Sequence, residues 1–308
     1  MSEAIAAIDC GTNTIKLLVG DPLQDSAGLR RATRMIRLGQ GVDATGRLAP
    51  EALARAWQAL DEYAAIIAEA GVRADRIRFC ATSATRDAEN SAEFVAGVRT
   101  RLGVDPEVLS GDEEARLAFA GAMRGLVGLV PVRQPALVVD IGGGSTELIL
   151  GDPSEGPTAA HSMNIGAVRL HERHVRNNPI NATEIAAVTA DVEAALDASP
   201  LDPARAATVV GVAGTVTTLA AGTLDLASYS RERIHGQSLR VVDVRGHIQS
   251  LVSMSVEERL QLPWMHPGRA DVIDAGALIL DRILARTHLS SLAIAESDIL
   301  DGIAWSLL

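Results

Sequence analysis

Two stretches of this chain carry the same pattern of residues. Residues 7–20 read AIDCGTNTIKLLVG, and residues 138–151 read VVDIGGGSTELILG. Aligned without a gap, they pair like with like: Asp9 with Asp140, Gly11 with Gly142, and Thr14 with Ser145. Apolar positions also coincide, except that Ile15 meets Thr146. Each stretch reads as a strand, a turn of small residues and a second strand. Because one copy heads each half of the chain, we predict a duplicated domain.

The pattern around these two copies is that of an α/β protein. Strands are indicated at residues 30–38, 76–84 and 106–110. Residues 50–70 carry apolar residues at helical spacing, with Pro50 at the start and Gly71 just past the end, which predicts a helix. Further helices are predicted after residue 84, through Phe94 and Val98, and over residues 112–127. Strands that alternate with helices favour the α/β class, and 308 residues suffice for two domains.

Composition narrows the class of protein further. The net charge is −11 and the pI is near 5.1, which argues against a non-specific nucleic-acid binder. The two cysteines, Cys10 and Cys80, lie in apolar runs and are too few for a disulfide scaffold, so we expect a reduced, cytoplasmic protein. The first residues show no signal-peptide pattern, and no apolar run is long enough to predict a membrane span.

The two turns of small residues suit a phosphate. In each, an Asp ends a strand, and the backbone N–H groups that follow can point into one concavity. The carboxylate itself repels phosphate, but it can hold a hydrated divalent cation that bridges phosphate oxygens. Asp140 and Glu147 bracket the sequence GGGST so that both could face one ion. The alternative is a plain hairpin with a solvated Glu. The matching turn after Asp9 favours two facing cradles.

Three other segments are candidates for a role in catalysis or binding. Residues 209–221 run from an apolar strand through Gly214 and Thr215 into a helix, whose first N–H groups suit phosphate; a simple capped turn is the alternative. Arg86 follows a strand and suits phosphate oxygens, or it pairs with a nearby surface carboxylate. In LSGDEEARL the acids can simply stabilise a helix start, or Glu113 or Glu114 can activate a water. Spacing does not choose between these two glutamates.

Histidine and serine chemistry is not favoured by the sequence. His171 and His174 are three residues apart, with no third ligand at metal spacing, and we interpret them as surface residues of a helix. Ser83 and Ser145 lack the His and Asp partners of a serine nucleophile.

Seven segments together resemble the exopolyphosphatase / guanosine pentaphosphate phosphohydrolase family. In chain order they are AIDCGTNTIKLL, IRLGQGVDATGRL, ATSATRDAEN, LSGDEEARL, VVDIGGGSTEL, VAGTVTTLAA and RADVIDAGALIL. The resemblance covers essentially the whole chain. It implies the actin-like (ribonuclease H-like) fold of the superfamily of actin, sugar kinases and heat-shock chaperones. We accordingly expect domain I at residues 1–125 plus 298–308, domain II at residues 126–297, and an interdomain cleft.

The resemblance also implies a role for each candidate residue. Glu114 matches the proposed base for the attacking water, and Arg86 matches an arginine on the phosphate chain. Asp140 and Glu147 match metal-associated carboxylates. The phosphate-binding positions fall in three groups: Asp9, Thr12 and Asn13; Gly142, Gly143, Gly144 and Ser145; and Gly214 and Thr215. Lys16, the arginines of residues 30–37 and Arg169 are further candidates for the path of the chain.

The expected activity follows from these roles. It is Mg²⁺-dependent hydrolysis of the terminal phosphoanhydride of inorganic polyphosphate, with release of orthophosphate. Removal of the 5′ terminal phosphate of guanosine pentaphosphate is the close alternative. A phosphate-transferring kinase and a non-catalytic sensor of polyphosphate or nucleotide are further alternatives. We expect a phosphoanhydride as the partner rather than nucleic acid or a membrane, and a homodimer is compatible with the sequence.

Overall fold

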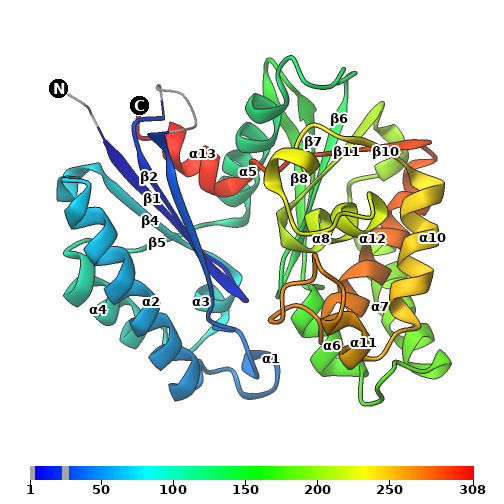
Figure 1. The fold of residues 1–308 in the computed structure, drawn as a ribbon, viewed down its shortest axis with the longest axis horizontal. Coiled ribbons are helices and arrows are strands. Elements are labelled where there is room, and N and C mark those ends of the chain that lie inside the picture. Colours follow the sequence, from blue (N-terminus) through cyan, green and yellow to red (C-terminus); the bar gives the residue numbers. More distant parts are fainter. Residues whose placement is uncertain (1–3, 23–27) are drawn as a thin grey trace. The chain divides into compact units, whose positions relative to one another are not determined.

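The computed structural model describes residues 4–22 and 28–308, and the chain divides into two compact units. The first unit is Met1–Gly121 with Ile299–Leu308, and the second is Ala122–Asp298. Figure 1 shows the elements of each unit. In the described ranges, no helix combines the length and the apolar composition needed to cross a membrane.

The first unit is built on a five-stranded mixed sheet. Its strand order is β3 (Arg30–Met35), β2 (Thr14–Gly20), β1 (Ile5–Cys10), β4 (Ile77–Ala81) and β5 (Glu107–Val108). Strands β1, β2 and β3 form an antiparallel meander, whereas β4 runs parallel to β1, and β5 runs parallel to β4. The parallel strands require crossover connections, which the helices between them supply.

Helices cover both faces of this first sheet (Figure 1). The long helix α2 (Pro50–Glu69) and helix α4 (Ser91–Leu102) pack on one face, where Ile8, Leu17 and Phe79 are buried. The last helix, α13 (Ile299–Trp305), packs against β1 and β2, and Asp301 in it pairs with Arg31 of β3. Alternation along β1 and β2 therefore puts Asp9 and Lys16 on the face opposite the α2 core.

Shorter helices complete the first unit. These are α1 (Val42–Thr45), the 3₁₀ turn Ala74–Arg76, α3 (Ser83–Asp87) and α5 (Gly111–Leu126), which continues into the second unit. The single helix predicted after residue 84 is two helices. The side chain of Asn90 explains the interruption, because it accepts from Leu48 N at 2.8 Å and donates to Leu48 O at 3.1 Å. These bonds tie the segment before α4 to another loop.

The second unit contains a six-stranded mixed sheet. Its order is β10 (Ser238–Arg240), β11 (Ser291–Ile294), β9 (Thr208–Val212), β6 (Ala136–Ile141), β7 (Thr146–Asp152) and β8 (Gly156–Met163). The helices of this unit are α6 (Ala167–His174), α7 (Ala182–Ala198), α8 (Ala213–Thr223), α9 (Arg231–Ile234), α10 (Val241–Val252), α11 (Val256–Leu260) and α12 (Ile273–Thr287), with a 3₁₀ turn at Pro203–Arg205.

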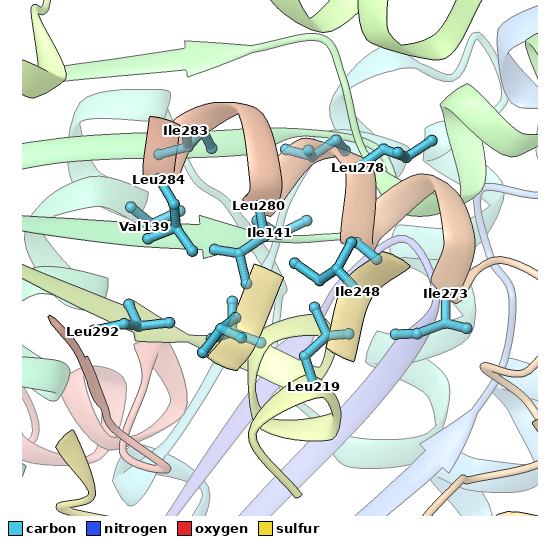
Figure 2. Close-up of a cluster of buried hydrophobic side chains, with 14 of the residues drawn as sticks. Val139, Ile141, Leu219, Ile248, Ile273, Leu278, Leu280, Ile283, Leu284 and Leu292 are labelled. Carbon is cyan, nitrogen blue, oxygen red and sulfur yellow. The ribbon is translucent and has the colours of Figure 1, made fainter. Parts of the chain in front are cut away.

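The core of the second unit lies between this sheet and α12 (Figure 2). Leu280, Ile283 and Leu284 of α12 belong to the same buried cluster as Val139 and Ile141 of β6. Burying one such side chain stabilises a fold by about 1.5–3 kcal/mol. The cluster therefore fixes the strand that carries Asp140, although Asp140 itself is on the other face.

Both units share one plan, which confirms the predicted duplication. The order β3-β2-β1-β4-β5 in the first sheet corresponds to β8-β7-β6-β9-β11 in the second, with β10 added at the edge. The strand register is also the same. Asp9 lies opposite Lys16, and the equivalent residues of the second copy, Asp140 and Glu147, also lie opposite each other. The repeat seen in the sequence is therefore a repeat of two α/β domains.

Candidate active site

The first turn, between β1 and β2, is anchored by hydrogen bonds from the segment that follows β3. Gly11 N donates to Thr14 O at 2.9 Å and closes the turn. Backbone N–H groups of residues 36, 37 and 39 donate to the carbonyl oxygens of Thr12 and Asn13 at 2.9–3.0 Å. Within a planar trans peptide, the C=O and N–H groups point in opposite directions. Anchoring these carbonyls therefore turns the N–H groups of Asn13 and Thr14 to the other side.

The second turn, between β6 and β7, repeats this geometry. Gly142 N donates to Ser145 O at 3.0 Å. The start of α6 then anchors three carbonyls of the turn: Ala167 N donates to Gly142 O at 2.9 Å, Val168 N and Arg169 N donate to Gly143 O at 2.9 and 3.0 Å, and Arg169 Nε donates to Gly144 O at 2.8 Å. The N–H groups of Gly143, Gly144 and Ser145 consequently point away from α6, as an anion cradle requires.

We call the set of hydrogen bonds that anchors each turn its clamp. In each unit, one glycine allows the close approach that the clamp requires. A Cβ on Gly39 would lie 2.2 Å from Thr12 Cγ2, and a Cβ on Gly166 would lie 2.4 Å from Gly143 O. Thr12 and Gly143 are equivalent positions of the repeat. Sequence reasoning gave Gly39 and Gly166 no role. The sequence does contain a pattern that could have indicated them. A glycine follows shortly after the third strand of each unit, in MIRLG at residues 35–39 and in MNIG at residues 163–166.

The strands beside the turns carry the charged groups. In the first unit, Lys16 Nζ lies 3.6 Å from Asp9 Oδ2 across the β1–β2 ladder. In the second, the directly opposed pair is Asp140 and Glu147, so two carboxylates share one face of the sheet. Glu147 is buried, and Ser162 of β8 donates to its Oε1 at 2.7 Å.

The pair Asp140 and Glu147 fits a hard divalent cation. Carboxylate oxygens are the ligands that Mg²⁺ prefers, and Mg²⁺ commonly takes only one or two of them together with water and phosphate. Opposed like charges on adjacent strands also repel, and a cation between them relieves that cost. Among residues 4–22 and 28–308, no group of three or more His, Cys, Asp and Glu side chains is placed to hold a metal. The two opposed carboxylates are a donor set that fits Mg²⁺.

The structure distinguishes the two glutamates that begin α5. Arg78 donates to Glu113 Oε1 at 2.9 Å and also pairs with Glu107, so Glu113 belongs to a structural ion-pair group. Glu114 is 8% exposed, and its Oε2 lies 3.3 Å from Arg86 Nη1. Arg86 Nη1 also donates to Leu109 O at 3.1 Å, which fixes the guanidinium beside the start of α5. The structure thus brings Glu114 and Arg86 together.

Ser110 caps the start of α5. Glu113 N donates to Ser110 Oγ at 3.3 Å, and Glu114 N donates to Ser110 O at 2.9 Å. The acids of this first turn also lie at the positive end of the helix dipole. The start of α5 therefore combines a capping serine, an ion-paired Glu113 and a buried Glu114.

The third candidate lies at the junction of β9 and α8. Ala213 has φ +64°, a left-handed conformation that is costly for a residue with a side chain. Next to it, a Cβ on Gly214 would lie 2.3 Å from the guanidinium of Arg269, and Thr218 accepts from Arg269 Nη1 at 3.2 Å. The side chain of Thr215 instead packs near Gly276 of α12, so only its backbone N–H suits an anion.

Arg269 is a residue that sequence reasoning missed. It opens the segment RADVIDAGALIL, which contributed to the resemblance without receiving a role. Its place in this segment could have drawn attention to it, but only the tertiary structure shows that this arginine reaches Gly214.

The arginines proposed for the path of the phosphate chain have structural partners. Arg30 pairs with Glu69 at 2.8 Å, Arg34 pairs with Glu62 at 2.8 Å, and Arg31 pairs with Asp301. Arg169 is part of the clamp on the second turn. His171 and His174 pair with Asp274 and Asp191, at 3.3 and 2.7 Å.

The two cysteines are buried and are not bonded to each other. Burial, reinforced by the charge of Asp9, raises the pKa of the Cys10 thiol well above its usual range. Burial likewise raises the pKa of Cys80 to about 12. Both thiols stay protonated at neutral pH, which disfavours a thiolate nucleophile in the first unit.

Two mixed sheets with the same strand order, each with a clamped turn of small residues, define a protein with the duplicated actin-like fold. Within that class, the chain belongs to the Ppx/GppA phosphatase family, whose sequence profile matches residues 24–308. It is 43% identical over 324 residues to Exopolyphosphatase 2 of Mycobacterium tuberculosis, with 98% of each chain covered.

Solved structures give the same result. An exopolyphosphatase-like protein matches with a TM-score of 0.91 and 40% identity, covering 99% of this chain and 100% of that one. An exopolyphosphatase from Cytophaga hutchinsonii matches with a TM-score of 0.88 and 26% identity, covering 99% and 97%.

Proposed function

We propose that this chain is an exopolyphosphatase that releases orthophosphate from the end of inorganic polyphosphate in a Mg²⁺-dependent reaction. Its likeness to proteins named exopolyphosphatase over nearly the whole chain supports this function. The observation that carries the proposal is the position of Glu114. It is a buried carboxylate beside the Arg86 guanidinium, whereas its neighbour Glu113 is bound to Arg78.

In the proposed reaction, Glu114 accepts a proton from a water molecule as the water oxygen attacks the terminal phosphorus. The bond from that phosphorus to the bridging oxygen breaks, and the shortened chain leaves with that oxygen. A positioned general base contributes about 10²–10⁴ in rate. Both contacts of Arg86 given above use Nη1. Its remaining N–H groups are the ones that the proposal assigns to the terminal phosphoryl oxygens.

The other candidate residues neutralise and hold the phosphate chain. Asp140 and Glu147 would hold Mg²⁺, which supplies the positive charge that lets phosphates approach carboxylates. The proposal assigns non-reacting phosphates to the N–H groups of the two clamped turns and of the start of α8. The proposed phosphate-binding segments comprise Asp9, Thr12, Asn13, Gly142, Gly143, Gly144, Ser145, Gly214 and Thr215.

Guanosine pentaphosphate phosphohydrolase activity is the second candidate. The observation that favours it is the family itself, because the same phosphoanhydride chemistry serves either substrate. A kinase and a non-catalytic sensor remain alternatives that an activity assay separates.

The test is a comparison of initial orthophosphate release from three substrates: long polyphosphate, short polyphosphate and guanosine pentaphosphate. Each is measured with Mg²⁺ and with the metal chelated, and once with ADP added. The proposal expects Mg²⁺-dependent release that is fastest from polyphosphate. Fastest release from guanosine pentaphosphate supports the second candidate. ATP formation identifies a kinase, and binding of polyphosphate without any release identifies a sensor.

A further inference from the structure

The two copies of the turn differ in the residue that faces their aspartate. Asp9 faces Lys16, whereas Asp140 faces Glu147, at the same position of the same register. Lys16 is the only lysine in a chain that otherwise uses arginine. One unit therefore places a fixed positive charge where the other places a second carboxylate.

The ion pair in the first unit is largely shielded from solvent. Lys16 Nζ lies 3.6 Å from Asp9 Oδ2, and the two side chains are 16% and 7% exposed. Poor solvation strengthens the attraction between the two charges. It also means that removing the ammonium leaves a buried carboxylate close to a turn whose N–H groups are oriented for an anion.

We propose that Lys16 takes the place of a metal ion in the first unit. It neutralises Asp9, so that phosphate meets the first turn without a second cation, and the chain binds one divalent cation rather than two. This inference rests on the proposed function, in which Asp140 and Glu147 hold the metal. An ordinary cross-strand ion pair with no bearing on phosphate is the alternative.

Exchanging the two residues tests the inference through metal binding rather than activity. The number of bound ions per chain is counted with Mn²⁺ alone, from the loss of the free-ion electron paramagnetic resonance signal. We expect one ion in the wild type, two in Lys16→Glu, none in Glu147→Lys and one in the variant with both exchanges. Circular dichroism checks that each variant is folded.

The outcomes separate the inference from the proposed function. Two ions in the wild type, or one ion in both the wild type and a folded Lys16→Glu, would overturn the inference and leave the function intact. A wild type that binds no Mn²⁺ would overturn both the inference and the metal assignment of the proposed function.

If Lys16→Glu does not fold, a variant without the added carboxylate provides a second test. Lys16→Met removes the charge and adds no metal ligand. We expect it to keep one Mn²⁺ and to bind tripolyphosphate at least about tenfold more weakly, because the ammonium of Lys16 no longer lies beside the Asp9 carboxylate. Binding is measured calorimetrically with Mg²⁺ in a Glu114→Gln background, which suppresses turnover. Arg73→Met, which removes an exposed pair with Asp75, is the control. Unchanged tripolyphosphate binding in Lys16→Met would contradict the inference.

Discussion

At the scale of single residues, Glu113 and Glu114 show how packing separates neighbours of identical chemistry. Both lie in the first turn of α5. One is tied to Arg78 and is partly exposed, and the other is buried beside Arg86. Successive residues of a helix point about 100° apart, so only one of the two can face a given site. We therefore expect Glu113 and Glu114 to have separate roles.

Glu114→Gln should lower the turnover of polyphosphate by about 10²–10⁴, because the amide cannot accept the proton of the attacking water. Binding of the phosphate chain should change little. Glu113→Gln is the matched control and should retain turnover within a few-fold, with a small loss of stability from the Arg78 pair. Steady-state kinetics of both variants at saturating Mg²⁺ make the comparison. Equal loss of turnover in the two variants would refute the assignment.

At the scale of elements, the clamp between α6 and the second turn depends on Gly166. Gly166→Ala places a Cβ against the backbone of Gly143, which cannot yield without moving the turn. Displacement of a binding group by about 1 Å can cost about 10²-fold in activity. We expect weaker substrate binding and lower turnover together.

A control for this variant is available in α10. A Cβ on Gly246 would meet no atom within 4 Å, so Gly246→Ala should leave activity unchanged and stabilise the helix by up to about 1 kcal/mol. Kinetics and thermal unfolding of both variants give the comparison. Normal kinetics in Gly166→Ala would show that the clamp does not position the turn.

The start of α7 gives a prediction about pH. Glu184 accepts hydrogen bonds from the backbone N–H groups of Asn181, Arg176 and Asn177 and from the Asn177 amide. These bonds, chiefly that from Asn181, lower the pKa of Glu184 from 4.5 to about 2. A depressed carboxyl pKa stabilises the fold above the unfolded pKa, and this contribution is lost as the pH falls through the folded pKa.

Glu184→Gln should therefore unfold at a lower denaturant concentration than the wild type at neutral pH. The difference should shrink from pH 4.5 downward, because the wild type then loses the same contribution. Denaturant unfolding across this pH range measures it. A difference that grows as the pH falls would contradict the stated origin of the pKa.

At the scale of the whole molecule, the duplication was predictable because it rests on a local pattern. Strand, turn and strand are encoded within residues 7–20 and within residues 138–151, and the register follows from the turn. The three candidate phosphate-binding segments are also local patterns, and the resemblance to a known family then implied a role for each of their residues.

Other features could not be predicted, because they depend on contacts between distant segments. The clamps at Gly39 and Gly166 form only when the third strand of each unit brings a loop back to the turn. The approach of Arg269 to Gly214 and the break between α3 and α4 have the same origin. The secondary-structure propensity of a segment does not reveal such contacts, because they join segments that are far apart in the sequence.

The proposed hydrolysis begins with the attack of water, activated by Glu114, on the terminal phosphorus of polyphosphate. It is tested most directly by a short incubation of polyphosphate with Mg²⁺ in ¹⁸O-labelled water, followed by mass spectrometry of the orthophosphate released. We expect one ¹⁸O atom in each released orthophosphate, and almost no release by Glu114→Gln over the same time. Unlabelled orthophosphate, or full release by the Glu114→Gln variant, would contradict it.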